Sequence, residues 1–337
     1  MRREVILVTG ANGEMGHELI PQIASRCDVI GLDIQPVDEK TASHCYKFIQ
    51  GDVLDEMLLG RLVAEYEIRS IFHLASILST KAEYNPIAAH RVNVEGTLNL
   101  LRLAVEQTQW QGKSVRFIYP SSIAVYGMPN LKIKMDSEAL TEDMFLMPTT
   151  MYGCNKLYCE HLGRYFEGYY KQLAAENISN TIDFRCIRFP GLISGTSIPT
   201  GGTSDYAPEI FHSAATNTPY KCFVRPDTVL PFMVMPDAIK SLITIESVPK
   251  SSLSKTTYNV TSFSMKAKEF HDIALQSFPH AQIIYEPSSK RQAIVDSWPA
   301  YLDDSSARSD WRWTPDYHEE NAFSEYLLPQ ITNHYKT

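Results

Sequence analysis

A tyrosine and a lysine four residues apart, Tyr152 and Lys156, are the pair in this sequence best suited to proton transfer. On a helix this spacing places both side chains on one face, with their Cβ atoms about 5–6 Å apart. A lysine ammonium beside a phenol favours the phenolate, so we expect the pKa of Tyr152 to fall below its usual value of about 10. Tyr152 could then act as a general base. The same spacing also occurs in helices whose side chains only pack. The rest of the sequence must therefore show whether this pair is catalytic.

A glycine-rich turn near the N-terminus predicts a dinucleotide site. The β-branched run 4–9 is followed by the sequence GANGEMG and then by a segment with helical periodicity. Strand, glycine loop and helix open a βαβ unit in which the backbone approaches a pyrophosphate and the helix N-terminus donates N–H groups to it. The residues that we expect to line the cofactor here are Gly10, Asn12, Gly13, Glu14, Met15 and Gly16.

Two carboxylates follow the next predicted strands. The strand 28–32 leads into Asp33, 17 residues after Gly16. A carboxylate there can accept hydrogen bonds from both adenosine ribose hydroxyls and repels a 2′-phosphate, which indicates NAD rather than NADP. A surface or helix-capping role for Asp33 is the alternative. After the strand 46–50, Asp52 could reach the adenine amino group beside Val53, or could cap the following helix.

The segment after the strand 70–73 is expected at the carboxyl edge of the sheet, where doubly wound folds bind ligands. His73 ends this strand and is interpreted as a packed histidine. An asparagine, Asn93, lies inside the predicted helix 86–107, where it is mildly unfavourable, so we expect it to hydrogen-bond towards the site. The residues expected to line the cofactor after this strand are Leu74, Ala75 and Ser76.

A serine is placed to meet the tyrosine. The strand 115–120 is followed by Ser121 and Ser122, and the predicted helix 149–175 begins with the Tyr/Lys pair. The hydroxyl of Ser122 can therefore approach Tyr152 from a neighbouring element. Serines at strand ends more commonly form turns or caps, which is the alternative for Ser122.

Composition excludes several classes of function. The formal charge is −8 and no basic run is present, which argues against nucleic acid or an anionic membrane as the main partner. No apolar run approaches the roughly 18 residues that could span a bilayer. The six cysteines form no CxxC pair, so we predict neither a metal site nor disulfides. We expect a small-molecule substrate and a soluble protein of the cytoplasm, or of the mitochondrial matrix if a presequence has been removed.

The strict α/β alternation ends near residue 190. We predict an α/β fold: a doubly wound parallel Rossmann sheet in residues 1–190, with a contribution from about 222–250, and a smaller α/β substrate lobe in residues 191–337. The polar segment 194–206 is rich in Gly, Ser and Thr, which suits a substrate-binding loop or, alternatively, a flexible connection.

The motifs TGANGEMG, GDV, HLAS, PSSIAVYG and YGCNK, in this order, resemble the extended short-chain dehydrogenase/reductase superfamily. This resemblance covers the whole chain and implies a homodimer that binds NAD. It implies Ser122, Tyr152 and Lys156 as the catalytic residues, with Asn93 as a frequent helper. It also places two residues near the nicotinamide, namely Phe189 and Pro190.

Stretches such as FPGLIS, GGTSDYAPEIF and SWPAYLDDSSARSDWRWTP resemble, more narrowly, the short-chain type of L-threonine 3-dehydrogenase. The implied reaction is oxidation of the 3-hydroxyl of L-threonine by NAD. The implied substrate contacts are Ser79, Ser122, Tyr152, Gly202 and Thr203. That type commonly has a tryptophan after PGLIS and three consecutive glycines, whereas here Gly195 follows Ser194 and Thr200 precedes two glycines.

Two other functions are compatible with these motifs. A nucleotide-sugar 4-epimerase or dehydratase needs basic residues for a diphosphate, yet residues 191–219 contain no Lys or Arg. A dehydratase also needs an acid beside the catalytic serine, where this chain has Ile123. A non-catalytic NAD-binding scaffold is the second alternative, against which the complete Ser/Tyr/Lys set argues.

Overall fold

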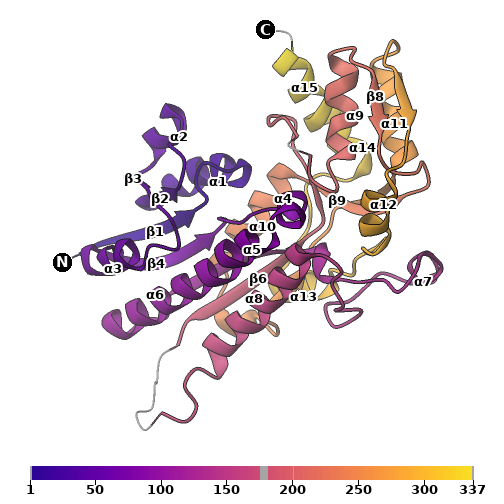
Figure 1. Ribbon diagram of the computed structural model, residues 1–337. Helices are drawn as coiled ribbons and strands as arrows, with labels where there is room; N and C mark the ends of the chain where they lie inside the picture. The colour runs from indigo at the N-terminus through magenta and orange to yellow at the C-terminus, as the bar shows by residue number, and fades with distance from the viewer. Residues whose placement is uncertain (1, 175–180, 200, 336–337) are drawn as a thin grey trace. The chain divides into compact units, whose positions relative to one another are not determined.

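The computed structural model describes residues 2–174, 181–199 and 201–335. Its central sheet has seven strands in the order β10-β6-β5-β4-β1-β2-β3 (Figure 1). The pairs β3/β2, β2/β1, β1/β4 and β4/β5 are parallel, so the chain crosses over on both sides of β1 as in a doubly wound fold. The strands are β1 (Arg3–Thr9), β2 (Val29–Asp33), β3 (Lys47–Gln50), β4 (Tyr66–His73), β5 (Arg116–Ser122), β6 (Asp183–Phe189) and β10 (Thr257–Asn259).

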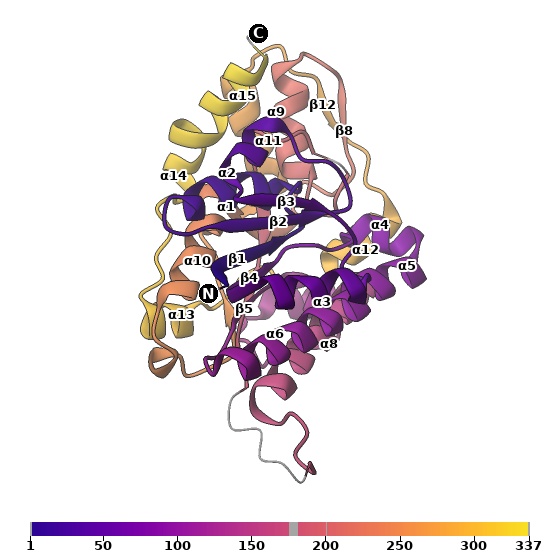
Figure 2. The same ribbon diagram turned by 90° about the vertical axis from the view of Figure 1, so that its left-hand side faces the viewer.

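Helices cover both faces of this sheet. Figure 2 shows α3, α6 and α8 lying alongside one another on one face, with α1 and α10 on the other. Side chains of α3, α6 and α8 share a core with β1, β4 and β5 that includes Leu59, Leu100, Phe117 and Cys159. The helices are α1 (Glu14–Ala24), α2 (Glu39–His44), α3 (Glu56–Glu65), α4 (Ser79–Tyr84), α5 (Pro86–His90), η1 (Arg91–Glu95), α6 (Gly96–Gln111), α8 (Met151–Gly168) and α10 (Met235–Ser247).

Local sequence signals explain where these helices begin and end. Asn85 caps α5 by accepting a hydrogen bond from Ala88, and Pro86 occupies the first helical position. The helix then widens into the π-turn η1 before α6, which ends at Gly112 with φ of 69°, a left-handed conformation that glycine adopts readily. The predicted helix 86–107 is therefore present, but it is interrupted by the π-turn that contains Asn93.

Two further sheets lie in the second half of the chain. One has the order β11-β9-β7, in which β11 pairs antiparallel and β7 parallel to β9; the other pairs β12 with β8. The strands are β7 (Gly191–Ile193), β8 (Tyr220–Cys222), β9 (Val229–Val234), β11 (Phe263–Lys266) and β12 (Ile283–Tyr285). The helices are η2 (Ile123–Val125), α7 (Leu131–Asp136), α9 (Tyr206–Ala215), η3 (Lys250–Ser252), α11 (Ala267–Ser277), α12 (Ser289–Asp296), α13 (Ser305–Trp311), α14 (Glu319–Asn321), η4 (Ala322–Leu327) and α15 (Leu328–Tyr335).

The chain divides into two compact units, each built from three segments. Unit 1 contains residues 1–121, 154–187 and 239–258, and unit 2 contains residues 122–153, 188–238 and 259–337. Unit 1 holds nearly all of the seven-stranded sheet, and unit 2 holds the two smaller sheets. The predicted α/β class with a parallel Rossmann sheet is confirmed, while the predicted division at residue 190 stays a prediction. The last residue of the predicted helix 149–175 lies outside the described residues.

No helix in the described ranges is both long and apolar enough to cross a membrane.

Candidate functional site

The glycine loop between β1 and α1 forms a close-packed turn. Gly10 has φ of 71°, and a Cβ atom on it would lie 2.6 Å from the backbone nitrogen of Ala75. A Cβ atom on Gly16 would lie 2.5 Å from the carbonyl oxygen of Ala11. Both positions therefore require glycine, one for its conformation and one for the approach of helix to loop. Gly13 is the N-cap of α1 and has no side chain to occupy the first N–H groups, which leaves a terminus shaped for a pyrophosphate.

Asp33 lies at the end of β2 beside this loop. Its Oδ2 accepts a hydrogen bond from the backbone N–H of Asn12 at 3.0 Å, and its Oδ1 accepts one from Gln35 at 2.9 Å. The carboxylate is thus directed to the glycine loop rather than to the start of a helix. The helix-capping alternative for Asp33 is wrong, because α2 is capped by Asp38.

Asp52 is exposed and does not cap α3. Its Oδ1 accepts a hydrogen bond from the backbone N–H of Leu54 at 3.0 Å, while Asp55 caps the helix by accepting from Leu58. The capping alternative for Asp52 is therefore wrong, and its contact with an adenine stays a prediction. Val53 is buried and would contact any Cβ atom placed on Gly96 of α6.

The segment after β4 is held by Asn93. The side-chain oxygen of Asn93 accepts from the backbone N–H of Ile77 at 2.7 Å and from the hydroxyl of Ser76 at 3.1 Å. Its amide nitrogen donates to the carbonyl of Ile77 at 3.0 Å. The π-turn η1 that contains this asparagine thus fixes the strand-end backbone, with Leu74 and Ala75 bonded in turn to β1 and Ser79 beginning α4.

Ser122 and Tyr152 meet as expected. The Ser122 hydroxyl makes a hydrogen bond with Tyr152, and its oxygen also accepts from the backbone N–H of Ala124 at 3.1 Å. Both interpretations of this serine hold, because it caps the short turn η2 and contacts the tyrosine. Ser121, by contrast, donates to the buried carboxylate of Glu160 at 2.5 Å and so faces away from this contact.

Lys156 is buried on the same helix, one turn after Tyr152. Its Nζ donates to the carbonyl of Pro120 at 2.7 Å and lies 4.7 Å from the centroid of the Tyr119 ring. Burial lowers the pKa of Lys156 to about 8, because a buried ammonium loses its hydration.

The expected lowering of the Tyr152 pKa is wrong for this structure. Burial raises the pKa of Tyr152, and the hydrogen bond from Ser122 opposes that rise only in part. The physical reason is desolvation, which disfavours the phenolate even though some of the Tyr152 surface is exposed. Tyr152 is therefore a phenol in this structure. It must lose its own proton, with the help of neighbouring groups, before it can accept one from a substrate.

Phe189 and Pro190 lie where the sequence places them, at the carboxyl end of β6. Phe189 is the last residue of the strand, Pro190 joins it to β7, and both are buried. This edge of the sheet is also where β1, β2 and β5 end. A role for either residue beside a nicotinamide stays a prediction.

The predicted substrate loop is folded back on itself. Gly201 has φ of 87°, and the backbone N–H of Gly202 donates to the carboxylate of Asp205 at 2.6 Å. Asp205 stands at the N-cap of α9 but makes no side-chain cap, because its carboxylate accepts from Gly202 in the loop instead. Thr203 is buried, with 4% of its surface exposed.

A residue that the sequence did not reveal holds this loop. Arg291 of α12 donates from Nη2 to the carbonyls of Gly201 and Gly202, at 3.2 and 2.6 Å. Its guanidinium carbon lies 3.2 Å from the centroid of the Phe223 ring. Arg291 is 89 residues from Gly202 in the sequence, and no sequence pattern around it indicates such a contact.

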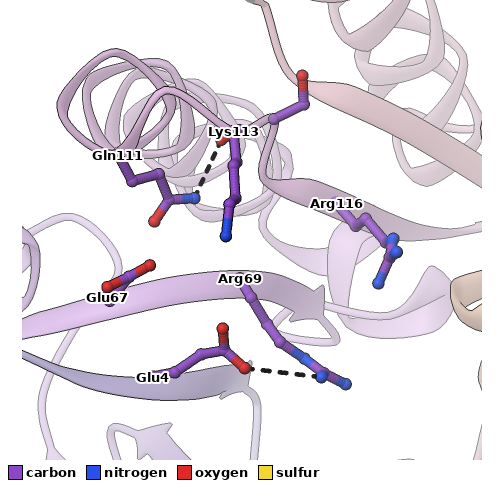
Figure 3. A pocket seen from close by; sticks show the side chains of 7 residues that line it. Glu4, Glu67, Arg69, Gln111, Lys113 and Arg116 are labelled. Atoms are coloured by element: carbon purple, nitrogen blue, oxygen red, sulfur yellow. Dashed lines mark hydrogen bonds and ion pairs between the residues drawn. The ribbon is translucent and has the colours of Figure 1, made fainter.

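A hollow at the opposite edge of the sheet does not coincide with these residues. Figure 3 shows side chains of β1, β4 and β5 around it, at the amino ends of these strands. Arg69 pairs with Glu4 at 3.8 Å, and Arg116 pairs with Glu246 at 3.1 Å, so cations and carboxylates offset one another at this hollow (Figure 3). The glycine loop and Asp33, at the carboxyl ends of β1 and β2, therefore form the candidate cofactor site of unit 1.

Comparison with known proteins identifies the family. A sequence model of the NAD dependent epimerase/dehydratase family matches residues 6–260. The chain belongs to this family. Its use of NAD agrees with the glycine loop and with Asp33 at the end of β2, and family membership together with its relatives makes it an NAD-dependent dehydrogenase.

Relatives and solved structures are similar over almost the whole chain. The mitochondrial L-threonine 3-dehydrogenase of Bos taurus is 35% identical over 319 residues, which are 93% of this chain and 79% of the relative. The L-threonine 3-dehydrogenase structure from Trypanosoma brucei is 32% identical with a TM-score of 0.86, covering 100% of this chain and 98% of that one. A monomeric L-threonine 3-dehydrogenase from a metagenome is 34% identical with a TM-score of 0.83, covering 97% and 98%.

Proposed function

We propose that this chain oxidises the 3-hydroxyl of L-threonine to 2-amino-3-oxobutyrate. The observation that carries the proposal is the contact of Ser122 with Tyr152 at the carboxyl edge of the sheet, in a chain similar over its whole length to proteins named L-threonine 3-dehydrogenase. Bound NAD supplies the acceptor for the hydride that leaves C3. The protein residues bind and orient the alcohol and receive the hydroxyl proton.

Each residue of the Ser/Tyr/Lys set has a separate task. Ser122 hydrogen-bonds the substrate hydroxyl and directs its proton towards Tyr152. Tyr152, once deprotonated, accepts that proton as the C3–H bond breaks. Lys156 carries the charge that stabilises the phenolate and holds the nicotinamide ribose. The zwitterionic end of the substrate is assigned to Ser79, Gly202 and Thr203.

A screen of NAD reduction tests the proposal. The purified chain is offered L-threonine, L-serine, D-threonine, 3-hydroxybutyrate and UDP-sugars, and NADH is followed by absorbance. We expect the highest kcat/KM with L-threonine. Epimerisation of a UDP-sugar without net NADH would assign the chain to the nucleotide-sugar branch, and inactivity with every alcohol would favour the scaffold alternative.

The pH dependence of turnover should report the Tyr152–Lys156 pair. Burial raises the pKa of Tyr152 and lowers that of Lys156 to about 8, so Lys156 loses its proton near pH 8 while Tyr152 remains a phenol. Neutral Lys156 can then accept the phenol proton of Tyr152 as Tyr152 takes the proton of the substrate hydroxyl. We expect kcat/KM for oxidation to rise about tenfold per pH unit below pH 8 and to level off above it. A profile that is flat between pH 6 and 8 would contradict this assignment.

Thr203→Val tests the substrate loop. The exchange keeps the shape of the buried side chain and removes its hydroxyl. If Thr203 binds the amino acid, KM for L-threonine should rise by about 10-fold, the effect of one lost hydrogen bond of about 1.4 kcal/mol, with NAD affinity unchanged. Ser204→Ala, at the next position, is the control and should keep the parent KM. A change confined to the melting temperature would reassign Thr203 to folding and move the substrate carboxylate towards Ser79.

We propose a homodimer that forms through α4, α5 and α8. Tyr84 and Ile87 are 86% and 71% exposed, and Tyr158 on α8 is 55% exposed, which is unusual for large apolar side chains. Light scattering should give twice the chain mass of 38.2 kDa. Ile87→Glu should shift the protein to monomers, whereas Met57→Glu, at an equally exposed site on α3, should not. A monomeric parent protein at micromolar concentration would contradict the proposal.

We retain the cytoplasm as the expected compartment, or the mitochondrial matrix if a presequence precedes this sequence. The bovine relative carries the word mitochondrial in its name. Imaging of the tagged full-length product in its own cells distinguishes the two.

A further inference from the structure

A chain of hydrogen bonds runs through the interior of unit 1, from the end of β1 to the π-turn η1. Nδ1 of His73 lies 2.8 Å from Oγ1 of Thr9, and Nε2 lies 2.9 Å from Oγ1 of Thr97. The Thr97 hydroxyl donates to the carbonyl of Asn93 at 2.5 Å, and the backbone N–H of Ala75 donates to Thr9 Oγ1 at 3.4 Å. Thr9, His73, Thr97 and Asn93 are all at least 98% buried, so water does not substitute for these partners.

The direction of each bond follows from counting hydrogens. A hydroxyl has one hydrogen, and that of Thr97 is used on the Asn93 carbonyl, so Thr97 can only accept from His73. Nε2 of His73 must then carry a hydrogen. Burial lowers the pKa of His73 to about 3, so the ring is neutral and has a single N–H. Nδ1 is therefore an acceptor for the Thr9 hydroxyl, whose oxygen is left to accept from Ala75.

The two ends of this chain hold the same stretch of backbone. At one end the Ala75 N–H is bonded through Thr9. At the other end lies Asn93, whose side chain binds both the N–H and the carbonyl of Ile77. Leu74 and Ala75, at the start of this stretch, pack so closely against Gly10 that a Cβ atom on Gly10 would lie 2.6 Å from the backbone nitrogen of Ala75.

We propose that His73 is a positioning residue, fixed as the neutral Nε2–H tautomer, which holds residues 74–77 in the shape that the NAD site requires. This role of His73 rests on the proposed function in one respect, namely that residues 74–77 line the NAD site. The ring centroids of Phe117 and Tyr119 each lie 6.0 Å from that of His73. If His73 only packed against these two rings, neither of its tautomers would be favoured.

Nitrogen NMR of the ¹⁵N-histidine-labelled protein, without NAD or substrate, tests the tautomer. The His73 signals are assigned by their loss in His73→Phe. We expect Nε2 to be protonated and Nδ1 unprotonated at every pH between 5 and 8. Thr97→Val removes the acceptor of Nε2–H and should shift the ring towards the Nδ1–H form, whereas Thr97→Ser keeps the hydroxyl and should not. An Nδ1–H tautomer in the parent protein, or no change in Thr97→Val, would overturn the proposal.

Affinity for NAD supplies the second measurement, by calorimetry in the absence of substrate. Thr97→Val should weaken NAD binding at least fivefold and Thr97→Ser should restore it. Thr108→Val is the matched control, because Thr108 is also a buried hydroxyl of α6 but accepts from Val115 at the far end of the helix. It should lower the melting temperature and leave NAD affinity unchanged. Parent-like NAD affinity in Thr97→Val would overturn the positioning role, even if the protein oxidises L-threonine. Conversely, the tautomer assignment can hold even if the protein does not oxidise L-threonine.

Discussion

Tyr152→Phe should lower kcat for L-threonine oxidation by at least the roughly 10²–10⁴-fold that accompanies loss of a general base. The ring of phenylalanine fills the same space on α8, so the exchange removes only the hydroxyl and its hydrogen bond with Ser122. NAD affinity and the melting temperature should therefore stay close to those of the parent protein. Stopped-flow or steady-state NADH formation gives kcat, and calorimetry gives the NAD dissociation constant.

Two further variants make this result specific. Tyr158→Phe removes a hydroxyl from an exposed position on the same helix and should leave kcat unchanged. Lys156→Met should damage both NAD affinity and turnover, because Lys156 is assigned to the cofactor ribose as well as to the phenolate. If Tyr152→Phe and Lys156→Met lose NAD affinity to the same degree, Tyr152 has a structural role and the proposed chemistry lacks its base.

Asp33→Gly should reverse the preference of the enzyme between its two possible cofactors. Two hydrogen bonds from ribose hydroxyls to a charged group contribute of order 1.5–3 kcal/mol each, so NAD binding should weaken by about 10²-fold or more. Removing the negative charge also relieves the repulsion of a 2′-phosphate, so NADP should bind more tightly than it does to the parent protein. Dissociation constants for both cofactors, measured without substrate, give the ratio directly.

Asp33 has a second, structural role, which must be distinguished from its effect on cofactor preference. Asp33 also accepts from the backbone N–H of Asn12, so its loss could loosen the glycine loop for either cofactor. Asp33→Asn keeps an oxygen for Asn12 while removing the charge. It should retain the melting temperature and still lose the preference for NAD. Asp55→Asn, which retains a capping side chain on α3, controls for the loss of one carboxylate from unit 1. An unchanged ratio in both Asp33 variants would refute the assignment.

Local chemistry made the shape of the glycine loop and the position of Asp33 beside it predictable. The glycine spacing requires a turn that only glycine fits at Gly10 and Gly16, and it specifies strand, loop and helix in that order. The carboxylate at the end of the second strand follows from the same unit. The contact of Ser122 with Tyr152 could be predicted because Ser122 ends the strand β5 and Tyr152 lies at the start of the helix α8. Each of these inferences depends on a short stretch of sequence.

Other features depend on distant parts of the chain and were not predicted. The sheet β11-β9-β7 escaped detection because β7 has only three residues and β9 contains Pro231, which is rare inside strands. Arg291 reaches the substrate loop from α12 only after the intervening chain has folded. The pKa of Tyr152 moved against expectation because it depends on the burial of the side chain, and spacing on a helix gives no information about desolvation.

The π-turn η1 has a consequence for how the gene can change. A π-turn contains one residue more than the α-helical turn that it replaces, so the segment 86–111 is longer by one codon than an unbroken helix between the same ends. Deleting one codon inside η1 would therefore restore an unbroken α-helix between the same ends and leave the buried face of α6, with Leu100, Leu101 and Ala104, in the core. It would remove the local geometry that places Asn93 on Ile77. Deleting one codon inside α6 would instead rotate the later residues of that helix by about 100°, so the π-turn is the part of this helix whose length can change without disturbing the core.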